Sequence, residues 1–194
     1  MPLLRLRCKP SQVFDPYPLP VVAPQRVDRR NGAIQRQCGE KHEERDDRID
    51  SHVGAEGPAQ VPQPILDAFN ENGWTFVIDG NYTANLGRQL GVNCIGATVF
   101  GENRIYVSES GATLHEFGHF YDSLLGFPDE HDRLYELEAA NAPMSEHAKG
   151  SSLEYFAEFF AYWCSGNTRT LALLKELTPE TYAYFGELSA AWLS

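Results

Sequence analysis

The residues best suited to do chemistry stand together in the run His115-Glu116-Phe117-Gly118-His119, which has the pattern H-E-x-x-H. Residues four apart on a helix lie one above the other, about 5–6 Å apart at Cβ, so both imidazoles can turn a ring nitrogen towards one Zn²⁺. Glu116 projects beside them, too far round the helix to be a third ligand. It can act as general base on a zinc-bound water and then donate that proton to the leaving amine. The run therefore indicates zinc-dependent hydrolysis of a peptide bond.

A catalytic zinc also needs a third protein ligand and one open position. A metzincin would supply a later glycine and a third histidine, but Asp122 and Leu125 occupy those positions, so that class is excluded. The other source is a glutamate from a later helix. Glu154 and Glu158 lie four residues apart in an otherwise strongly apolar segment, where unpaired carboxylates are costly to bury. The two buried carboxylates would be explained if one of them binds the metal and the other orients a histidine ligand.

Helix capping offers a competing explanation for two of these glutamates. Thr113-x-x-Glu116 and Ser151-x-x-Glu154 both have the spacing of a capping box, in which the glutamate bonds back to the helix start. In the second case Glu158 would face solvent. The residue patterns by themselves leave these alternatives open.

The two motifs in this order, the second being Glu154-Tyr155-Phe156-Ala157-Glu158-Phe159-Phe160, resemble the catalytic domain of anthrax lethal factor and the related Pro-Pro endopeptidases. The resemblance covers about residues 61–194 and implies a zincin-like fold. It implies that His115, His119 and Glu154 bind Zn²⁺. Glu158 matches the second glutamate of the family motif, and we assign it to the residues that orient the ligands.

The chain departs from this family at one position. The family has a tyrosine seven residues before the ligand glutamate, where its hydroxyl stabilises the tetrahedral intermediate, and this sequence has His147 there. An imidazole N–H can also donate to a developing oxyanion, so we expect His147 to take that catalytic role; the alternatives are a weakened enzyme or a surface histidine. Asp122, on the same helix face as His115 and His119, is a further candidate to orient a ligand, or an ordinary surface residue.

Hydrophobic and turn patterns predict the elements that hold these residues. Helices are predicted over 64–73, 112–125, 151–163 and 179–192, and strands over 74–78, 95–100 and 104–108, the last two forming a hairpin. Strands come first and helices follow, so we expect an α+β fold with a small sheet and a mostly helical C-terminal part. By resemblance to zincins, the strand 104–108 could pair with an extended peptide substrate.

Composition changes sharply near residue 60. Residues 1–60 carry ten Lys/Arg and nine Asp/Glu with two aromatic residues, whereas residues 61–194 carry six and eighteen with twenty-one aromatics. Few large apolar groups with much proline and charge give little surface to bury against the entropy of ordering the chain. We therefore predict a disordered arm or leader over 1–60 and a zincin-like catalytic domain over 61–194.

Composition also narrows the partners. The acidic C-terminal part is a poor candidate for nucleic-acid binding, which needs a basic face, and no apolar run is long enough to cross a membrane. Charge breaks the N-terminal region before any apolar segment of a signal peptide develops. The four cysteines show no C-x-x-C spacing, which argues against a cysteine zinc site and leaves the redox compartment open.

The sequence thus predicts a monomeric zinc metallopeptidase whose partner is a peptide or protein substrate. Two other functions stay open: a degenerate zincin-like domain that binds peptide without cleaving it, and a helical domain without metal. The compartment is not readable, although the resemblance suggests a protein that is secreted or delivered outside the producing cell.

Overall fold

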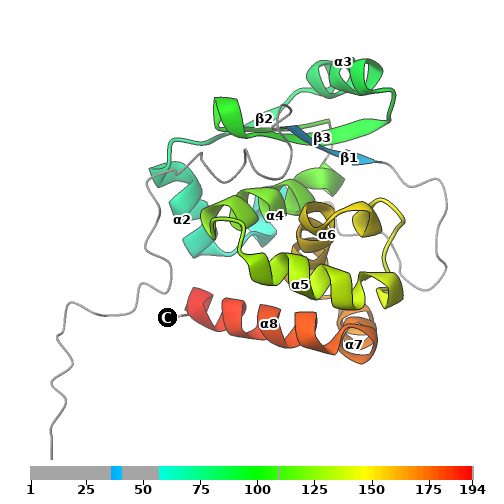
Figure 1. The fold of residues 1–194 in the computed structure, drawn as a ribbon. Coiled ribbons are helices and arrows are strands. Elements are labelled where there is room, and N and C mark those ends of the chain that lie inside the picture. The colour runs from blue at the N-terminus through cyan, green and yellow to red at the C-terminus, as the bar shows by residue number, and fades with distance from the viewer. Residues whose placement is uncertain (1–35, 41–56, 109, 194) are drawn as a thin grey trace, which may run out of the picture.

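The computed structural model describes residues 36–40, 57–108 and 110–193 of the chain. Four strands form one sheet in the order β1-β3-β4-β2 (Figure 1). Strand β4 runs parallel to β2 and antiparallel to β3, and β3 runs antiparallel to β1. The strands are β1 (Arg36–Glu40), β2 (Thr75–Ile78), β3 (Cys94–Val99) and β4 (Arg104–Val107).

Helices make up most of the remaining described chain, and the α+β class is confirmed. They are α2 (Gln63–Glu71), α3 (Gly80–Leu90), α4 (Thr113–Leu124), α5 (Asp129–Glu138), α6 (Ser152–Ser165), α7 (Thr168–Leu177) and α8 (Pro179–Ala190). Short 3-10 turns, among them one over Gly57–Gln60, join these elements. No helix within the described ranges is both long and apolar enough to cross a membrane.

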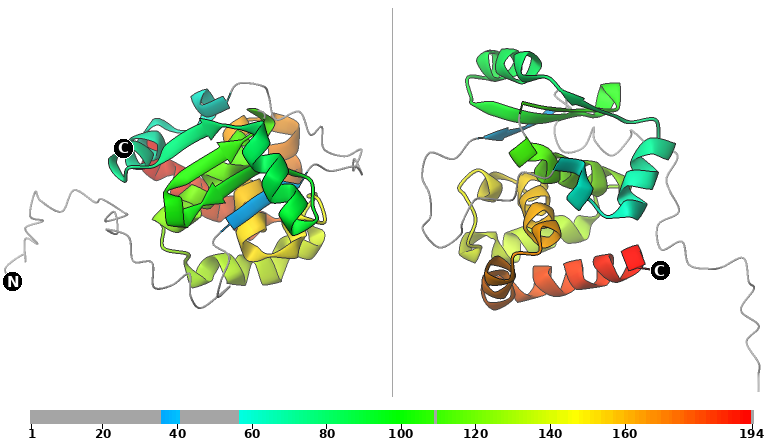
Figure 2. Two further views of the ribbon diagram at one scale, coloured as in Figure 1. Left: turned by 90° about the horizontal axis from the view of Figure 1, so that it is seen from above. Right: turned by 180° about the vertical axis from the view of Figure 1, so that it is seen from behind.

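The sheet is covered on both faces because its strands alternate their side chains between two cores. Tyr106 packs beneath α3 with Leu86, while its neighbours Ile105 and Val107 pack on the opposite side with the helical core. Helix α3 lies above the sheet, and α4 lies below it between the sheet and the other helices (Figures 1 and 2). The candidate ligands on α4 therefore lie at the boundary between sheet and helices.

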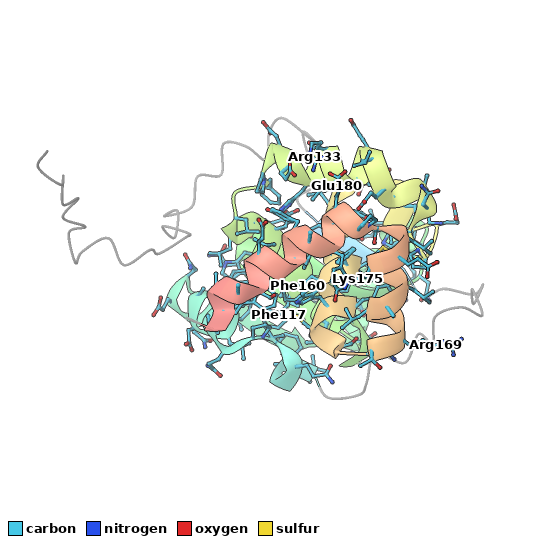
Figure 3. All side chains as sticks on the ribbon, turned by 90° about the horizontal axis from the view of Figure 1, so that it is seen from below. Phe117, Arg133, Phe160, Arg169, Lys175 and Glu180 are labelled. Carbon is cyan, nitrogen blue, oxygen red and sulfur yellow. The ribbon has the colours of Figure 1, made fainter. Side chains whose placement is uncertain are left out.

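The last helix closes the domain from below. Helix α8 packs against α5 and α7, and the Arg133 guanidinium donates to the Glu180 carboxylate at 2.9 Å across the α5–α8 boundary (Figure 3). Inside, the Glu138 carboxylate of α5 accepts the backbone N–H groups of Glu180 and Thr181 at 2.9 and 2.8 Å. The N-cap residue of α8, Thr178, makes no side-chain bond to the first N–H groups of the helix. The Glu138 carboxylate accepts hydrogen bonds from these groups instead.

Helices α4 and α6 pack so closely that a glycine is required between them. A Cβ on Gly118 would lie 2.7 Å from Ala157 Cα and 2.8 Å from its carbonyl oxygen. This close approach brings the histidine-bearing face of α4 against the glutamate-bearing face of α6.

The first prediction concerns this contact. In an open helix, Gly→Ala is favourable by roughly 0.5–1 kcal/mol, and Gly186→Ala in α8, where a Cβ meets no atom within 4 Å, should follow that rule. Gly118→Ala should instead lower stability by about 1–3 kcal/mol, because the methyl group must push two backbones apart. Thermal unfolding of both variants tests the expected opposite signs. Equal gains in Tm would show that the helices are not held at this distance.

The region before residue 60 departs from the predicted arm in two places. Residues 36–40 form strand β1 and residues 57–60 a 3-10 turn, so the expectation of an unstructured arm is wrong for these segments. Backbone pairing with β3 needs no large apolar side chain, and composition alone could not reveal it. The rest of the predicted arm lies outside the described residues. The boundary of the catalytic domain at residue 61 stays a prediction.

One further expectation changes in the structure. Strand β4 lies between β3 and β2, so both of its edges are paired, and the expectation that 104–108 binds an extended peptide is wrong. Cys94 is disulfide-bonded, whereas Cys164 is free. Burial raises the pKa of the Cys164 thiol, which keeps it protonated and unreactive.

Candidate metal centre

Three candidate ligands meet where α4 packs on α6. His115 and His119 stand one turn apart on α4, and Glu154 lies in the first turn of α6. Ser151 caps α6 by accepting the Glu154 backbone N–H at 3.2 Å, so half of the expected capping box is present. The Glu154 side chain, however, reaches across to the histidines, and its carboxylate therefore belongs to the cluster.

The donor atoms of these residues converge on one point. His115 Nε2 lies 3.1 Å from His119 Nε2 and 3.0 Å from Glu154 Oε2, and His119 Nε2 lies 3.5 Å from the same oxygen. Ligands bound about 2.0–2.1 Å from a tetrahedral zinc stand roughly 3.3 Å from one another. Two imidazoles and one carboxylate at this spacing are a donor set suited to Zn²⁺.

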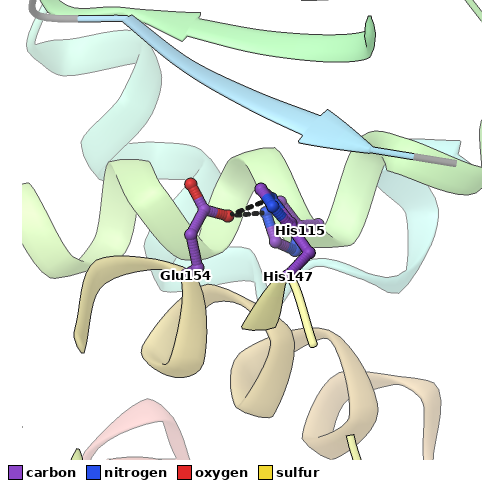
Figure 4. Close-up of side chains that lie close together, drawn as sticks. All are labelled: His115, His147 and Glu154. Carbon is purple, nitrogen blue, oxygen red and sulfur yellow. Dashed lines mark hydrogen bonds and ion pairs between the residues drawn. The ribbon is translucent and has the colours of Figure 1, made fainter. Parts of the chain in front are cut away.

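His147 lies beside the same carboxylate. It precedes a 3-10 turn before α6, and its Nε2 is 2.9 Å from Glu154 Oε2. Donor atoms of His115, His147 and Glu154 all lie within 4.8 Å of one another (Figure 4). His147 is thus close enough to act either on a bound substrate or as a further ligand.

The charges in the cluster are strongly coupled. Burial alone would lower the pKa of His115, but its hydrogen bonds to Glu154 and Glu158 hold that pKa well above the usual value. Burial would raise the pKa of Glu154, but the neighbouring His119 charge and the bond from His115 hold it well below its usual range. A positively charged imidazole beside an ionised carboxylate offsets the free energy that burial of either charge alone would cost.

Glu158 lies behind the first histidine. Its Oε2 is 3.0 Å from His115 Nδ1, the ring nitrogen that faces away from His119 and Glu154. A carboxylate in this position fixes the orientation of the ring and increases its basicity as a ligand. Glu158 therefore makes the contact that its predicted role requires, and it does not face solvent.

Glu116 is enclosed between α4 and β3. It is fully buried, one carboxylate oxygen accepts a hydrogen bond from Thr98 Oγ1 at 2.7 Å, and burial raises its pKa. Its other oxygen, Oε1, has no hydrogen-bond partner among the described residues. A buried carboxylate oxygen beside the candidate ligands is left free to take a proton, and the capping box that Thr113 could have formed with Glu116 is absent.

Gly96 makes room for this carboxylate. A Cβ there would lie 2.4 Å from Glu116 Oε1 and 2.9 Å from Ala112 Cβ. Glu116 Oε1, the nearest atom, is the end of a side chain and can move without the backbone. A substitution at Gly96 should therefore leave the fold intact but displace the Glu116 carboxylate.

The second prediction follows from this contact. For the zinc-dependent peptide hydrolysis that the sequence predicts, Gly96→Ala should keep bound zinc but lower turnover by about 10²-fold, since a displacement near 1 Å at a reacting group has that cost. Gly111→Ala, where a Cβ meets nothing within 4 Å, is the matched control. Peptide turnover and zinc content of both variants check this, and unchanged turnover in Gly96→Ala would show that the carboxylate has more room.

Asp122 has a different surrounding from the one predicted. It is buried, which excludes the surface role, and its Oδ1 lies 2.7 Å from His131 Nδ1 on α5. The other ring nitrogen of His131 lies 3.0 Å from the Tyr184 hydroxyl on α8, and the ring stacks on Phe156. This network ties α4 to α5 and α8. Sequence reasoning missed His131, because no local spacing links it to these partners.

Searches against protein-family models, curated proteins and solved structures gave no match for this chain.

Proposed function

We propose that the protein is a zinc-dependent metalloendopeptidase with a zincin-like catalytic domain, similar to lethal factor and the Pro-Pro endopeptidases. The observation that carries the proposal is the convergence of His115, His119 and Glu154 within 3.5 Å beside a buried glutamate with an unpaired oxygen. His115, His119 and Glu154 would hold Zn²⁺, and Glu158 would orient His115.

The residues around the ion divide the reaction between them. Zn²⁺, when bound, lowers the pKa of water and polarises a carbonyl oxygen. Glu116 removes a proton from the attacking water through Oε1, while Thr98 holds the other carboxylate oxygen in place. The raised pKa of Glu116 suits it to keep that proton until the amine leaves. His147 donates an N–H to the oxyanion of the tetrahedral intermediate.

A second candidate function is supported by the position of His147. With Nε2 only 2.9 Å from Glu154 Oε2, His147 could complete a four-ligand set with His115, His119 and Glu154. Four protein ligands are typical of structural zinc sites, whereas catalytic sites keep a position open. Such a chain would be the degenerate domain that binds peptide without cleaving it.

The third prediction tests the metal itself. Protein purified in the presence of zinc should contain one zinc per chain by elemental analysis, and His119→Ala should lose most of it. His131→Ala is a matched control, because this histidine is equally buried but lies in the Asp122 network. Zinc-free wild-type protein would exclude both functions. Retention of zinc by His119→Ala would exclude the proposed ligand set.

A further inference from the structure

His147 and Glu154 meet from two different parts of the chain. Glu154 lies in the first turn of α6, whereas His147 belongs to the segment 142–151 that leads into this helix, here called the His147 segment. The 2.9 Å contact between His147 Nε2 and Glu154 Oε2 therefore depends on how this segment is held. A group that acts on a reacting atom must keep its place to within about 1 Å.

Tyr135 of α5 holds the His147 segment just beyond His147 itself. The Tyr135 hydroxyl donates a hydrogen bond to the Lys149 carbonyl oxygen at 2.6 Å. Backbone bonds close the same turn: the Gly150 N–H donates to the His147 carbonyl at 2.9 Å. The Lys149 N–H donates to the Ser145 carbonyl at 3.1 Å. Because these bonds join His147 to the carbonyl that Tyr135 binds, a shift of this carbonyl moves His147 with it.

The same helix also holds the start of α6. Asp132, three residues before Tyr135, accepts a hydrogen bond from Ser152 Oγ at 2.5 Å, and Ser152 is the first residue of α6. Glu154 follows two residues later. Helix α5 packs against α6 and α8 (Figure 1). It therefore makes a side-chain bond to each of the two parts of the chain that carry His147 and Glu154.

Polar side chains of α5 face the protein rather than water alone. His131, Asp132 and Tyr135 lie on one side of the helix, because residues three and four apart are neighbours on its surface. Each of them contacts a different element. Tyr135 binds the His147 segment, Asp132 binds α6, and His131 lies 2.7 Å from Asp122 on α4. A helix that served only to keep the surface charged would need none of these contacts.

We propose that Tyr135 is a positioning residue of the candidate centre, which fixes His147 against Glu154 through the Lys149 carbonyl. It acts through another residue and not on a reacting atom. The use made of His147, as an oxyanion donor or as a ligand, rests on the proposed function. The placement of His147 is measurable without turnover.

Two variants that each lose one hydroxyl test this role in the full-length chain. Tyr135→Phe keeps the ring, which packs edge-on against Tyr155 with 5.9 Å between the ring centroids. Tyr155→Phe is the matched control, because its hydroxyl bonds Thr181 Oγ1 of α8 at 3.1 Å and not the His147 segment. Each variant is made alone and together with His147→Ala. The measurements are amide hydrogen exchange over residues 147–151, zinc affinity by competition against a chelator, and peptide turnover.

Tyr135→Phe should speed exchange of these amides and lower the quantity that depends on His147 by about tenfold, as loss of an outer partner of a metal site does. That quantity is kcat if His147 is an oxyanion donor and zinc affinity if it is a ligand. In the His147→Ala background, the same change should alter either quantity by less than about twofold, because the residue through which Tyr135 acts is gone. Tyr155→Phe should leave exchange, zinc affinity and kcat unchanged.

The outcomes separate this inference from the proposed function. Zinc binding without turnover, together with a loss of zinc affinity in Tyr135→Phe that requires His147, would support the positioning role and count against hydrolysis. Unchanged zinc affinity and turnover in Tyr135→Phe would overturn the positioning role, and a wild type that hydrolyses peptides would then keep the proposed function. Unchanged amide exchange, an equal loss in Tyr155→Phe, or a loss that persists in the His147→Ala background would overturn it as well. A wild type without zinc or turnover would overturn both.

Discussion

Glu116→Gln is expected to lower kcat by about 10²–10⁴-fold while leaving one zinc bound, because the glutamine cannot take a proton from water. The amide has the shape of the carboxylate, and its carbonyl oxygen can still accept the bond from Thr98 Oγ1. The side chain is not among the converging ligand atoms. Steady-state kinetics of the full-length variant and of wild type give the readout together with elemental analysis.

Glu154→Gln is the control that should lose both properties. Glu154 is also buried, and the substitution replaces the same atoms, but its Oε2 is one of the three donor atoms that converge on the metal position. If Glu116→Gln lost zinc as readily as Glu154→Gln, Glu116 would be a ligand. If it kept full activity, proton transfer would have to be assigned to another group.

The strongest local signals predicted the helices that carry the site. Helix α6 begins at a Ser151 side-chain cap and ends at Gly166 in the left-handed conformation, and both residues are legible in the sequence. The predicted bounds of helix α4 and of strands β3 and β4 agree with the structure to within two residues at each end. Strong periodicity and explicit end signals need no tertiary information.

The missed elements depend on contacts that no local pattern records. Helix α3 contains Gly80 and Gly87 and few apolar residues, although Asp79 caps it and Gly91 ends it. Helix α5 is mostly charged, and it packs against α6, a contact that its own sequence does not record. Strand β1 is specified by pairing with residues almost sixty positions later. Non-local pairing of this kind has no signature within the segment itself.

The candidate site was easier to predict than its surroundings. Spacing and resemblance named the atoms that converge, including Glu158 behind His115. They did not indicate that Gly96 leaves space for Glu116, or that Asp122 bonds His131 in a separate network. Both facts depend on which strand or helix lies opposite, and a single sequence does not record that.

His147→Ala should lower kcat by about 10²–10³-fold without loss of zinc, the usual cost of removing one donor to an oxyanion. His147→Tyr should keep or raise activity, since a phenol hydroxyl can donate from the same position. Both variants are assayed in the full-length chain, with zinc affinity measured by competition against a chelator. Ser145→Ala, two residues earlier in the same loop, controls for disturbance of the turn, because its hydroxyl accepts the Ala148 N–H and lies outside the ligand cluster.

The same variants decide between an open and a closed site. If His147 is a fourth ligand, His147→Ala should weaken zinc binding and open a coordination position, so activity should rise from a wild type that cleaves nothing. If it is an oxyanion donor, zinc affinity should stay constant and only kcat should fall. His147 Nε2 lies 2.9 Å from Glu154 Oε2, a distance that fits both a zinc ligand and an oxyanion donor. The effect of His147→Ala on zinc affinity therefore distinguishes the two roles. Wild-type activity and affinity in His147→Ala would remove His147 from both roles.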